Sequence, residues 1–252
     1  RRHKVKELEL FIANSDVKKA FEKSYKGEFN LEDITKFFTS KNTLDYDFTN
    51  KSCAIVGSSD NILNYKYGEE IDSHDYIIRS NAARLEGFED WCGSRTDFRV
   101  ISGKTFSSIN HDKTNAPVPN ASWFPRLKGE HFLVRSVPGG IERSFSVIDR
   151  HMNGKNKLNF IHEDLEKYSK EITGCIEAST GFIAILIGTM LFRTINIYGY
   201  SFYDGKNEQQ TNHYYQHYPF STGVIHRFDN ELNVVKRLEK QGLLSIKNGE
   251  KL

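Results

Sequence analysis

The chain has 252 residues, of which 38% are hydrophobic and 13% aromatic, so it can bury a core and is not a wholly disordered protein. Its formal net charge of +2 includes no long Lys/Arg block, which argues against a nucleic-acid binder but tolerates an anionic ligand. No apolar run reaches the ~18–20 residues that span a bilayer, and the longest, residues 181–192, predicts a buried helix instead.

The N-terminal part of the chain is predicted to be helical. Residues 4–40 carry apolar side chains at helix-like spacing in several pieces. The first residues are charged and lack the apolar core of a secretion signal, so a true N-terminus or an anchor could precede residue 1. We expect residues 1–50 to form a helical segment that packs on a core domain of residues 51–252.

Strands and helices alternate in the core domain. It begins at Cys53 with a short apolar run that ends in glycine, as buried parallel strands do. Further strands are predicted at 75–81, 96–102, 131–136 and 195–202, and helices at 142–151, 163–171, from Thr180 onward and at 232–241. This alternation predicts a single α/β domain with a mostly parallel sheet.

Ligands of such sheets bind at the carboxyl ends of the strands. The turn after the first strand ends there, where Gly57 lets the backbone approach a ligand and Ser58, Ser59 and Asn61 can bond a ribose or a base. The turn has neither the ending of a P-loop nor a GxGxxG pattern. An ordinary strand-to-helix turn is the alternative interpretation.

Two polar triplets are further candidates. Residues 79–81 (Arg-Ser-Asn) close a strand, where Asn81 could bond a nucleotide and the arginine could instead pair with Asp72 or Asp75. Residues 179–181 (Ser-Thr-Gly) precede the apolar helix. They could cap it, or bind an anion through its free N–H groups.

Two histidines could carry acid–base chemistry. His213, with Tyr215 close by, offers donors to a phosphate, and a protonated histidine would stabilise charge on a leaving nucleotide. A polar surface loop is the alternative. His226 precedes Glu231, which could orient the histidine or cap a helix, and a histidine suits a general base.

Metal binding is not predicted. No carboxylate accompanies the histidines at ligand spacing, and Asp45-Tyr46-Asp47, a DxD pattern, lies before the first core strand and is interpreted as surface acids. The three cysteines are expected to be buried, reduced thiols. The polar loops 103–131 and 203–222 are long for simple connections, and we expect them to close over the substrates.

Taken in order, these segments resemble the sialyltransferase family and its sialylmotifs. Residues 53–101 resemble motif L, from the cysteine and glycine turn to I-D-x-H-D, R-x-N and G-S-R-T. Residues 178–200 resemble motif S, with S-T-G, an apolar helix and a Y-G ending. Residues 213–215 (H-Y-Y) resemble motif III, and residues 226–231 (H-x4-E) motif VS. Four motifs in the right order are hard to obtain by chance.

The resemblance implies a GT-A-like, Rossmann-like fold and transfer of sialic acid from CMP-sialic acid to a hydroxyl of a glycan or glycolipid acceptor. Inversion and the absence of any metal or other cofactor are implied with it. His226 would deprotonate the acceptor and His213 would assist the departing phosphate. The residues implied for the donor are Gly57, Ser58, Ser59, Asn61, Asn81, Ser179, Thr180, Gly181, Tyr198, Gly199 and Tyr215.

The sequence departs from the family pattern at three places. Cys53 matches a motif L cysteine whose family partner lies in the motif S helix, where this chain has no cysteine. That absence favours a cytoplasmic, bacterial-type enzyme over a Golgi-lumen enzyme. Ala178 stands where a proline is frequent, and Ser58 stands where an asparagine is frequent, so some donor contact could differ.

Several alternatives stay open. The donor could carry another CMP-activated ulosonic acid such as Kdo, or the protein could be a glycan- or nucleotide-binding relative that has lost catalysis. The missing GxGxxG argues against an NAD-dependent enzyme. Acceptor, linkage and oligomeric state are not predicted, and association with a membrane surface would need a preceding segment.

Overall fold

The computed structural model describes residues 46–81, 83–102, 129–135, 157–202, 213–215 and 227–247. The chain divides into two compact units. Unit 1 comprises Arg1–Tyr46 and Ile101–Tyr168, and unit 2 comprises Asp47–Val100 and Ser169–Leu252. The predicted division at residue 50 stays a prediction, because residues 1–45 lie outside the described residues.

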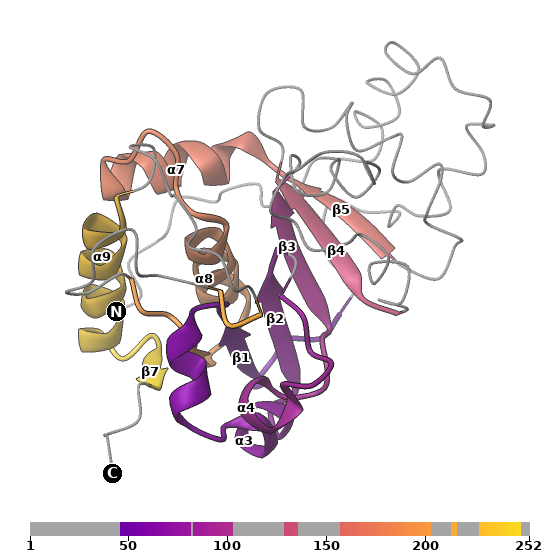
Figure 1. The fold of residues 1–252 in the computed structure, drawn as a ribbon. Coiled ribbons are helices and arrows are strands. Elements are labelled where there is room, and N and C mark those ends of the chain that lie inside the picture. The colour runs from indigo at the N-terminus through magenta and orange to yellow at the C-terminus, as the bar shows by residue number, and fades with distance from the viewer. Residues whose placement is uncertain are drawn as a thin grey trace, which may run out of the picture. The chain divides into compact units, whose positions relative to one another are not determined.

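Unit 2 is built on a parallel sheet, which confirms the predicted α/β class (Figure 1). Its strands run in the order β3-β2-β1-β6-β7, and every pair among them is parallel. Their bounds are β1 Ser52–Val56, β2 Tyr76–Ser80, β3 Phe98–Ser102, β6 Thr194–Tyr198 and β7 Ser245–Lys247. Strand β1 is central, and its apolar residues are fully buried, as expected of a strand covered on both faces.

One face of this sheet is covered by helix α8 (Thr180–Leu191), which packs against β1, β2 and β6. A Cβ on Gly188 would lie 2.3 Å from the Cδ1 atom of Ile55, so the helix approaches the sheet closely there. The predicted buried helix at 181–192 is thereby confirmed. No helix in the described part of the chain is long and apolar enough to cross a bilayer.

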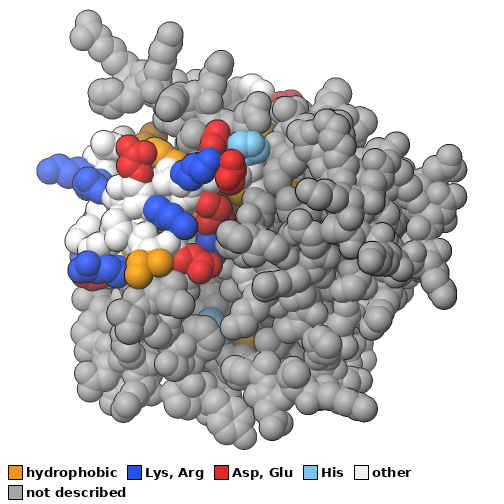
Figure 2. Space-filling view, turned by 90° about the horizontal axis from the view of Figure 1, so that it is seen from above, with side chains coloured by type: hydrophobic (Ala, Val, Ile, Leu, Met, Phe, Trp, Pro, Cys, Tyr) orange, Lys and Arg blue, Asp and Glu red, His pale blue; other side chains and the backbone are white. Residues whose placement is uncertain are grey.

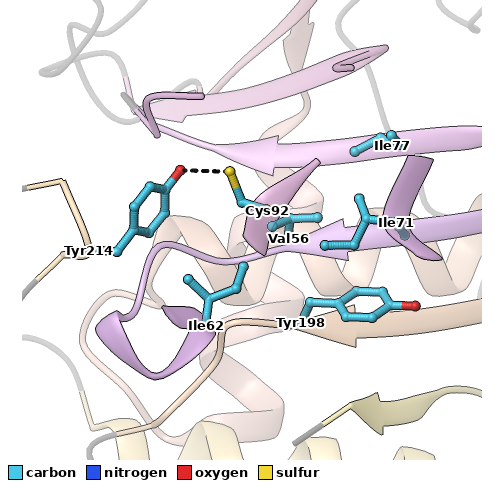
Figure 3. Packing of buried hydrophobic residues seen from close by; sticks show 8 residues of the cluster. Val56, Ile62, Ile71, Ile77, Cys92, Tyr198 and Tyr214 are labelled. Atoms are coloured by element: carbon cyan, nitrogen blue, oxygen red, sulfur yellow. Dashed lines mark hydrogen bonds between the residues drawn. The ribbon is translucent and has the colours of Figure 1, made fainter. Parts of the chain in front are cut away.

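The opposite face is covered by three short helices. They are η1 (Asp60–Asn64), α3 (Gly68–Asp72) and α4 (Glu89–Cys92). Figure 3 shows their side chains packed on those of β1, β2 and β6 in one apolar cluster. Its members are Ala54, Val56, Ile62, Ile71, Ile77, Cys92, Tyr198 and Tyr214.

Unit 1 contains the parallel pair β4 (His131–Arg135) and β5 (Lys157–Ile161). Arg135 donates two hydrogen bonds, of 2.6 and 2.7 Å, to the carboxylate of Glu166 on helix α7 (Glu163–Thr173). A buried guanidinium needs such a bidentate partner. On the surface seen in Figure 2, the described acidic and basic side chains lie intermingled. On α7, Lys167 pairs with Glu163 at 2.9 Å.

The structure shifts several predicted boundaries. The strand predicted at 195–202 ends at Tyr198, because Gly199 turns the chain with a φ of 68°. The helix predicted at 232–241 is α9 (Phe228–Lys240), which begins four residues earlier. The elements β5, β7, α3 and α4 were not predicted. The helical predictions at 4–40 and 142–151 lie outside the described residues.

Three aspartates hold the amino-terminal ends of β1, β2 and β3. Asp75 accepts hydrogen bonds from the backbone N–H and hydroxyl of Ser52, each 2.9 Å long. Asp97 accepts from the N–H of Ile77 at 2.8 Å. Asp72 accepts from the N–H and hydroxyl of Ser94. Here the I-D-x-H-D segment of motif L binds its G-S-R-T segment, and both act as scaffold.

Arg79 pairs with neither Asp72 nor Asp75, which corrects that interpretation. Its guanidinium donates to the carbonyl of Arg95 and to the hydroxyl of Thr96, at 2.8–3.1 Å. The arginine is fully buried under the motif L helices, whereas both aspartates use their oxygens for backbone amides. Its role within the described residues is structural.

Candidate active site

The polar residues predicted for the site converge at the carboxyl ends of the unit 2 strands. Ser58 and Ser59 follow β1, Asn81 follows β2, and Gly199 follows β6. The N–H of Ser59 donates to the carbonyl of Gly199 at 3.1 Å, which joins the turns after the two central strands. Open α/β sheets bind their ligands at this edge.

The segment 213–215 lies against the turn after β1. Ser59 and His213 form an isolated antiparallel bridge, and the N–H of Tyr214 donates to the carbonyl of Ser58 at 3.1 Å. The Ser58 hydroxyl lies 2.8 Å from Nδ1 of His213. The rings of His213 and Tyr215 stack with their centroids 5.3 Å apart. Motif III is thus held to motif L by backbone and side chain together.

Burial sets the protonation of these side chains. It lowers the pKa of His213, although the carbonyl of Ser58 and the charge of Asp60 oppose the shift. Burial also raises the pKa of Tyr215, against the nearby charge of Arg99. The resting site therefore favours a neutral imidazole, whereas the role predicted from the sequence needs a protonated one.

Tyr214, between them, serves the core. Its hydroxyl donates to the carbonyl of Arg84 and lies 3.7 Å from Sγ of Cys92, as Figure 3 shows for the sulfur. Its ring packs edge-on against Phe88. Because the Tyr214 side chain is held in the core, its neighbours in the chain, His213 and Tyr215, are held in place as well.

The segments that resemble motifs S and VS meet at a buried carboxylate. Glu231, in the first turn of α9, is fully buried and accepts hydrogen bonds from the N–H and the hydroxyl of Ser179, each 2.7 Å long. The same hydroxyl accepts from the N–H of Phe182 and so caps α8. Glu231 thereby fixes the start of α8, where Thr180 and Gly181 begin the helix. The H-x4-E spacing was the only sequence signal of this link.

Tyr200 explains why glycines stand around it. Its hydroxyl donates to the carbonyl of Gly181 at 3.1 Å, and burial raises its pKa. A Cβ on Gly181 would lie 3.0 Å from the Tyr200 ring, and a Cβ on Gly57 would lie 2.4 Å from the carbonyl oxygen of Gly199. The three glycines predicted for donor binding are thus also demanded by packing. Tyr200 was missed because its type and position resembled an ordinary strand residue.

Two asparagines face the same edge. Asn81 adopts a φ of 48°, a left-handed conformation that asparagine tolerates, and its carbonyl accepts from the buried guanidinium of Arg99 at 2.8 Å. Asn61 has a buried Oδ1 atom that no described residue bonds. A buried acceptor of this kind is costly unless a ligand or water bonds it. Arg99 was not singled out in the sequence.

The other predicted residues differ in placement. Tyr198 lies inside the apolar cluster, where its hydroxyl donates to Glu70 at 2.8 Å. Its assignment to the donor stays a prediction, and within the described residues it packs in the core. His226 lies outside the described residues, as do most residues of the two long loops.

The cysteines Cys53, Cys92 and Cys175 are free and buried, as expected. Asp47 is exposed and its carboxylate accepts from the N–H of Thr49, which agrees with a surface acid, while Asp45 lies outside the described residues. Among the described residues, no group of three His, Cys, Asp or Glu side chains is placed to hold a metal.

Comparison with known proteins gives one family. The model of glycosyltransferase family 29 (sialyltransferase) matches residues 6–243. A Sus scrofa CMP-N-acetylneuraminate-beta-galactosamide-alpha-2,3-sialyltransferase 1 is 26% identical over 79% of this chain and 58% of the relative. A Gallus gallus beta-galactoside alpha-2,6-sialyltransferase 2 is 27% identical over 75% of this chain and 38% of the relative. The chain spans only about half the length of these relatives.

Solved structures share the fold. A mammalian sialyltransferase in complex with Gal-beta-1-3GalNAc-ortho-nitrophenol aligns with a TM-score of 0.64 at 20% identity, over 97% of this chain and 92% of that one. The alpha-2,3-sialyltransferase Cst-I from Campylobacter jejuni aligns with a TM-score of 0.50 at 15% identity, over 82% and 78%. At these identities the likeness supports the GT-A-like fold and not a residue assignment.

Proposed function

Since the chain belongs to glycosyltransferase family 29, the sialyltransferases, we propose that it transfers sialic acid from CMP-sialic acid to a hydroxyl of a galactoside acceptor. The observation that carries this proposal is the family match across residues 6–243. Of the two relatives named above, one is a beta-galactosamide alpha-2,3-sialyltransferase and the other a beta-galactoside alpha-2,6-sialyltransferase. Because these two relatives form different linkages, the proposal names no linkage for this chain.

The donor is proposed to bind at the carboxyl edge of unit 2. The start of α8 presents backbone N–H groups of a capped helix, which suit an anion. The Oδ1 atom of Asn61 can accept a hydrogen bond from the nucleotide.

His213 is proposed to assist the leaving phosphate. When the Ser58 hydroxyl donates to Nδ1, the neutral ring keeps its proton on Nε2, which can donate to a phosphate oxygen. A phosphate placed beside the ring raises the pKa of His213 from its lowered resting value. The histidine can therefore gain a proton as the donor binds and hold it where charge develops.

His226 is proposed as the base. The acceptor oxygen bonds to the anomeric carbon while the bond from that carbon to the CMP phosphate oxygen breaks. The acceptor proton passes to His226, and the electron pair of the broken bond stays on CMP. In-line displacement inverts the anomeric carbon. His226 directly precedes α9, and the first turn of α9 carries Glu231, which bonds Ser179. The proposed base therefore lies close in the chain to the carboxylate that holds the start of α8.

Transfer is proposed to need no metal. CMP is a monophosphate ester and leaves with less charge than a diphosphate, so hydrogen-bond donors can stabilise it. The cytoplasmic, bacterial-type location expected from the cysteines gains no support, since the Sus scrofa and Gallus gallus relatives are vertebrate proteins. The proposed partners remain a CMP-activated acidic sugar and a glycan or glycolipid acceptor.

The test is a transfer assay with CMP-sialic acid and a Gal-β1,3-GalNAc acceptor in EDTA. We expect sialylated product with wild-type protein, and no product with His226→Ala, which should still bind CMP. Transfer from CMP-Kdo alone, or a requirement for a divalent metal, would contradict the proposal. Loss of CMP affinity with normal turnover in His226→Ala would refute the role of that residue.

A further inference from the structure

The ring of Tyr200 lies between two segments of the candidate active site. Tyr200 follows Gly199, which ends β6, and its side chain is buried. A Cβ on Gly57 would lie 3.0 Å from the Cδ2 and Cε2 atoms on one edge of the ring. A Cβ on Gly181 would lie 3.0 Å from the Cε1 atom on the other edge. The turn after β1 and the first turn of α8 are therefore separated by the width of one aromatic ring.

The Tyr200 hydroxyl adds a directional contact to this packing. It donates to the carbonyl of Gly181 at 3.1 Å. Burial and the charge of Glu231 raise the pKa of Tyr200, so the hydroxyl keeps its proton and remains a donor. Glu231 itself accepts from the N–H and the hydroxyl of Ser179. The first turn of α8 is thus held at two points, by a carboxylate and by a phenol.

Phe202 covers one face of the Tyr200 ring. The two rings stack with their centroids 5.5 Å apart and their planes inclined by 27°. Phe202 is buried and has a φ of 45°, a left-handed conformation that a bulky residue seldom adopts. Such a conformation persists only where the surrounding structure holds it. The Tyr200 ring is therefore packed on both edges and on a face, and a shift of the ring would move the segments that it touches.

Two explanations of the glycine at position 181 can be separated. Either a donor approaches the backbone there, or the Tyr200 ring fills the space. The three atoms nearest to a Cβ on Gly181 all belong to Tyr200, at 3.0, 3.6 and 3.7 Å. At Gly57 the nearest atom is instead the carbonyl oxygen of Gly199, at 2.4 Å. Removal of the ring would therefore free space at Gly181 but not at Gly57.

We propose that Tyr200 is a positioning residue for the donor, because its ring sets the separation between the turn after β1 and the start of α8. This inference rests on the proposed function for the identity of the donor. Tyr200 acts through the backbone of Gly57 and Gly181 and needs no contact with the donor itself. Its ring fixes the distance between the two segments, and its hydroxyl fixes the orientation of the helix turn.

The first test is calorimetric titration with CMP. Tyr200→Phe keeps the ring and loses the hydroxyl, and it should lower CMP affinity by about 2–10-fold. In the transfer assay its KM for CMP-sialic acid should rise by the same factor, with kcat nearly unchanged. The matched control is Tyr76→Phe, which loses a hydroxyl that donates to the carbonyl of Asp47 at the amino-terminal end of β2. It should change CMP affinity by less than about twofold.

The second test is a double-mutant cycle with the same titration. Gly181→Ala should lower CMP affinity by about tenfold in the wild-type chain, because its Cβ meets the ring. In a Tyr200→Leu chain, which lacks the three nearest atoms, it should cost less than about twofold more. Gly57→Ala should be harmful in both chains, because the Gly199 carbonyl remains. Thermal unfolding checks that each variant folds, and the first test decides if Tyr200→Leu does not.

An equal loss from Gly181→Ala in both chains would overturn the proposal, since the glycine would then answer to the donor and not to the ring. So would Tyr200→Phe protein that unfolds at a lower temperature but binds CMP as tightly as wild type. If the CMP affinities change as expected while wild type transfers no sialic acid, the role of Tyr200 stands and the proposed function fails. If wild type sialylates and the Tyr200 variants match it, the reverse holds.

Discussion

At the amino-terminal ends of the unit 2 strands, polar side chains bond one another, whereas at the carboxyl ends they keep atoms for a ligand. Asp72 and Asp97 use their carboxylates for backbone N–H groups of the neighbouring segments. At the other end, Asn61 has a buried acceptor that no described residue bonds. The first edge is closed chemically and the second is open.

This difference divides the segment that resembles motif L. Its I-D-x-H-D and G-S-R-T parts lie at the closed edge and are joined by Arg79, while its glycine turn and Asn81 lie at the open edge. The polar residues of this motif therefore belong to two different places in the fold, and only one of them is a candidate ligand site. The two edges predict different consequences for the same type of substitution.

The largest expected contrast is between two histidines. His213→Ala should lower kcat by about 10²–10⁴-fold, the usual effect of losing an acid–base group, and should lower the thermal midpoint only modestly, since it removes one contact with Ser58 and the stack on Tyr215. His74, at the closed edge, is buried, and its Nε2 atom lies 2.9 Å from Nδ2 of Asn196. His74→Ala should therefore lower the thermal midpoint and leave the kcat of the folded protein unchanged. Steady-state kinetics and thermal unfolding check both. A His213→Ala protein with normal kcat would break the comparison.

Glu231→Gln should affect both properties, because the carboxylate joins the two elements of the open edge. In the variant, the amide nitrogen of glutamine would replace one carboxylate oxygen. The Ser179 N–H or hydroxyl that donates to that oxygen would then lose its acceptor, which costs about 1–3 kcal/mol of stability. If Ser179 positions the donor, KM for CMP-sialic acid should rise more than KM for the acceptor. A rise confined to KM for the glycan acceptor would show that Glu231 acts through His226 instead.

Asp72→Ala should act on stability alone. The substitution removes the acceptor of the Ser94 N–H and hydroxyl, and we expect a loss of about 1–2 kcal/mol in urea unfolding. CMP affinity of the folded protein should stay within about twofold of wild type, since no part of the open edge is touched. Weakened CMP binding at unchanged stability would reverse the roles of the two edges.

The smallest effect is expected from acid. Hydrogen bonds from Ser52, with Lys51 adding to them, lower the pKa of Asp75 from 3.8 to about 2. Between these values the unfolded chain binds more protons, so this contribution to stability is present above pH 4 and is lost as pH falls toward 2. Urea midpoints between pH 5 and 3 should fall less steeply for Asp75→Asn than for wild type. Equal slopes would exclude Asp75 as a source of acid sensitivity.

Sequence patterns identified the strands well where apolar runs end at glycine or asparagine. β1 and β2 were predicted because their residues are buried on both faces, and the turns at Gly57 and Asn81 mark their ends. Strand β5 was missed because Lys157 and Asn159 interrupt its apolar residues; Asn159 is nevertheless buried, and its Oδ1 atom lies 2.7 Å from Nε2 of His131. Short helices such as α3 give too few turns for a periodic signal.

The members of the site were predictable, but their connections were not. Ser58, His213 and Ser179 stand at turns whose residue types suggest ligands, so the sequence reveals them individually. The contact between Ser58 and His213 joins residues 155 positions apart, and that between Ser179 and Glu231 joins residues 52 apart. Such pairs depend on tertiary packing and leave no local pattern. Tyr200 and Arg99 were missed for the same reason.

The most direct test of the two-edge account is calorimetric titration with CMP in EDTA for wild type, Ser58→Ala and Ser94→Ala. Each substitution removes one serine hydroxyl, which contacts His213 at the open edge or Asp72 at the closed edge. The account predicts that wild type binds CMP, that Ser58→Ala weakens binding several-fold, and that Ser94→Ala binds normally but unfolds at lower temperature. Absence of CMP binding to wild type, or equal weakening in both variants, would contradict it.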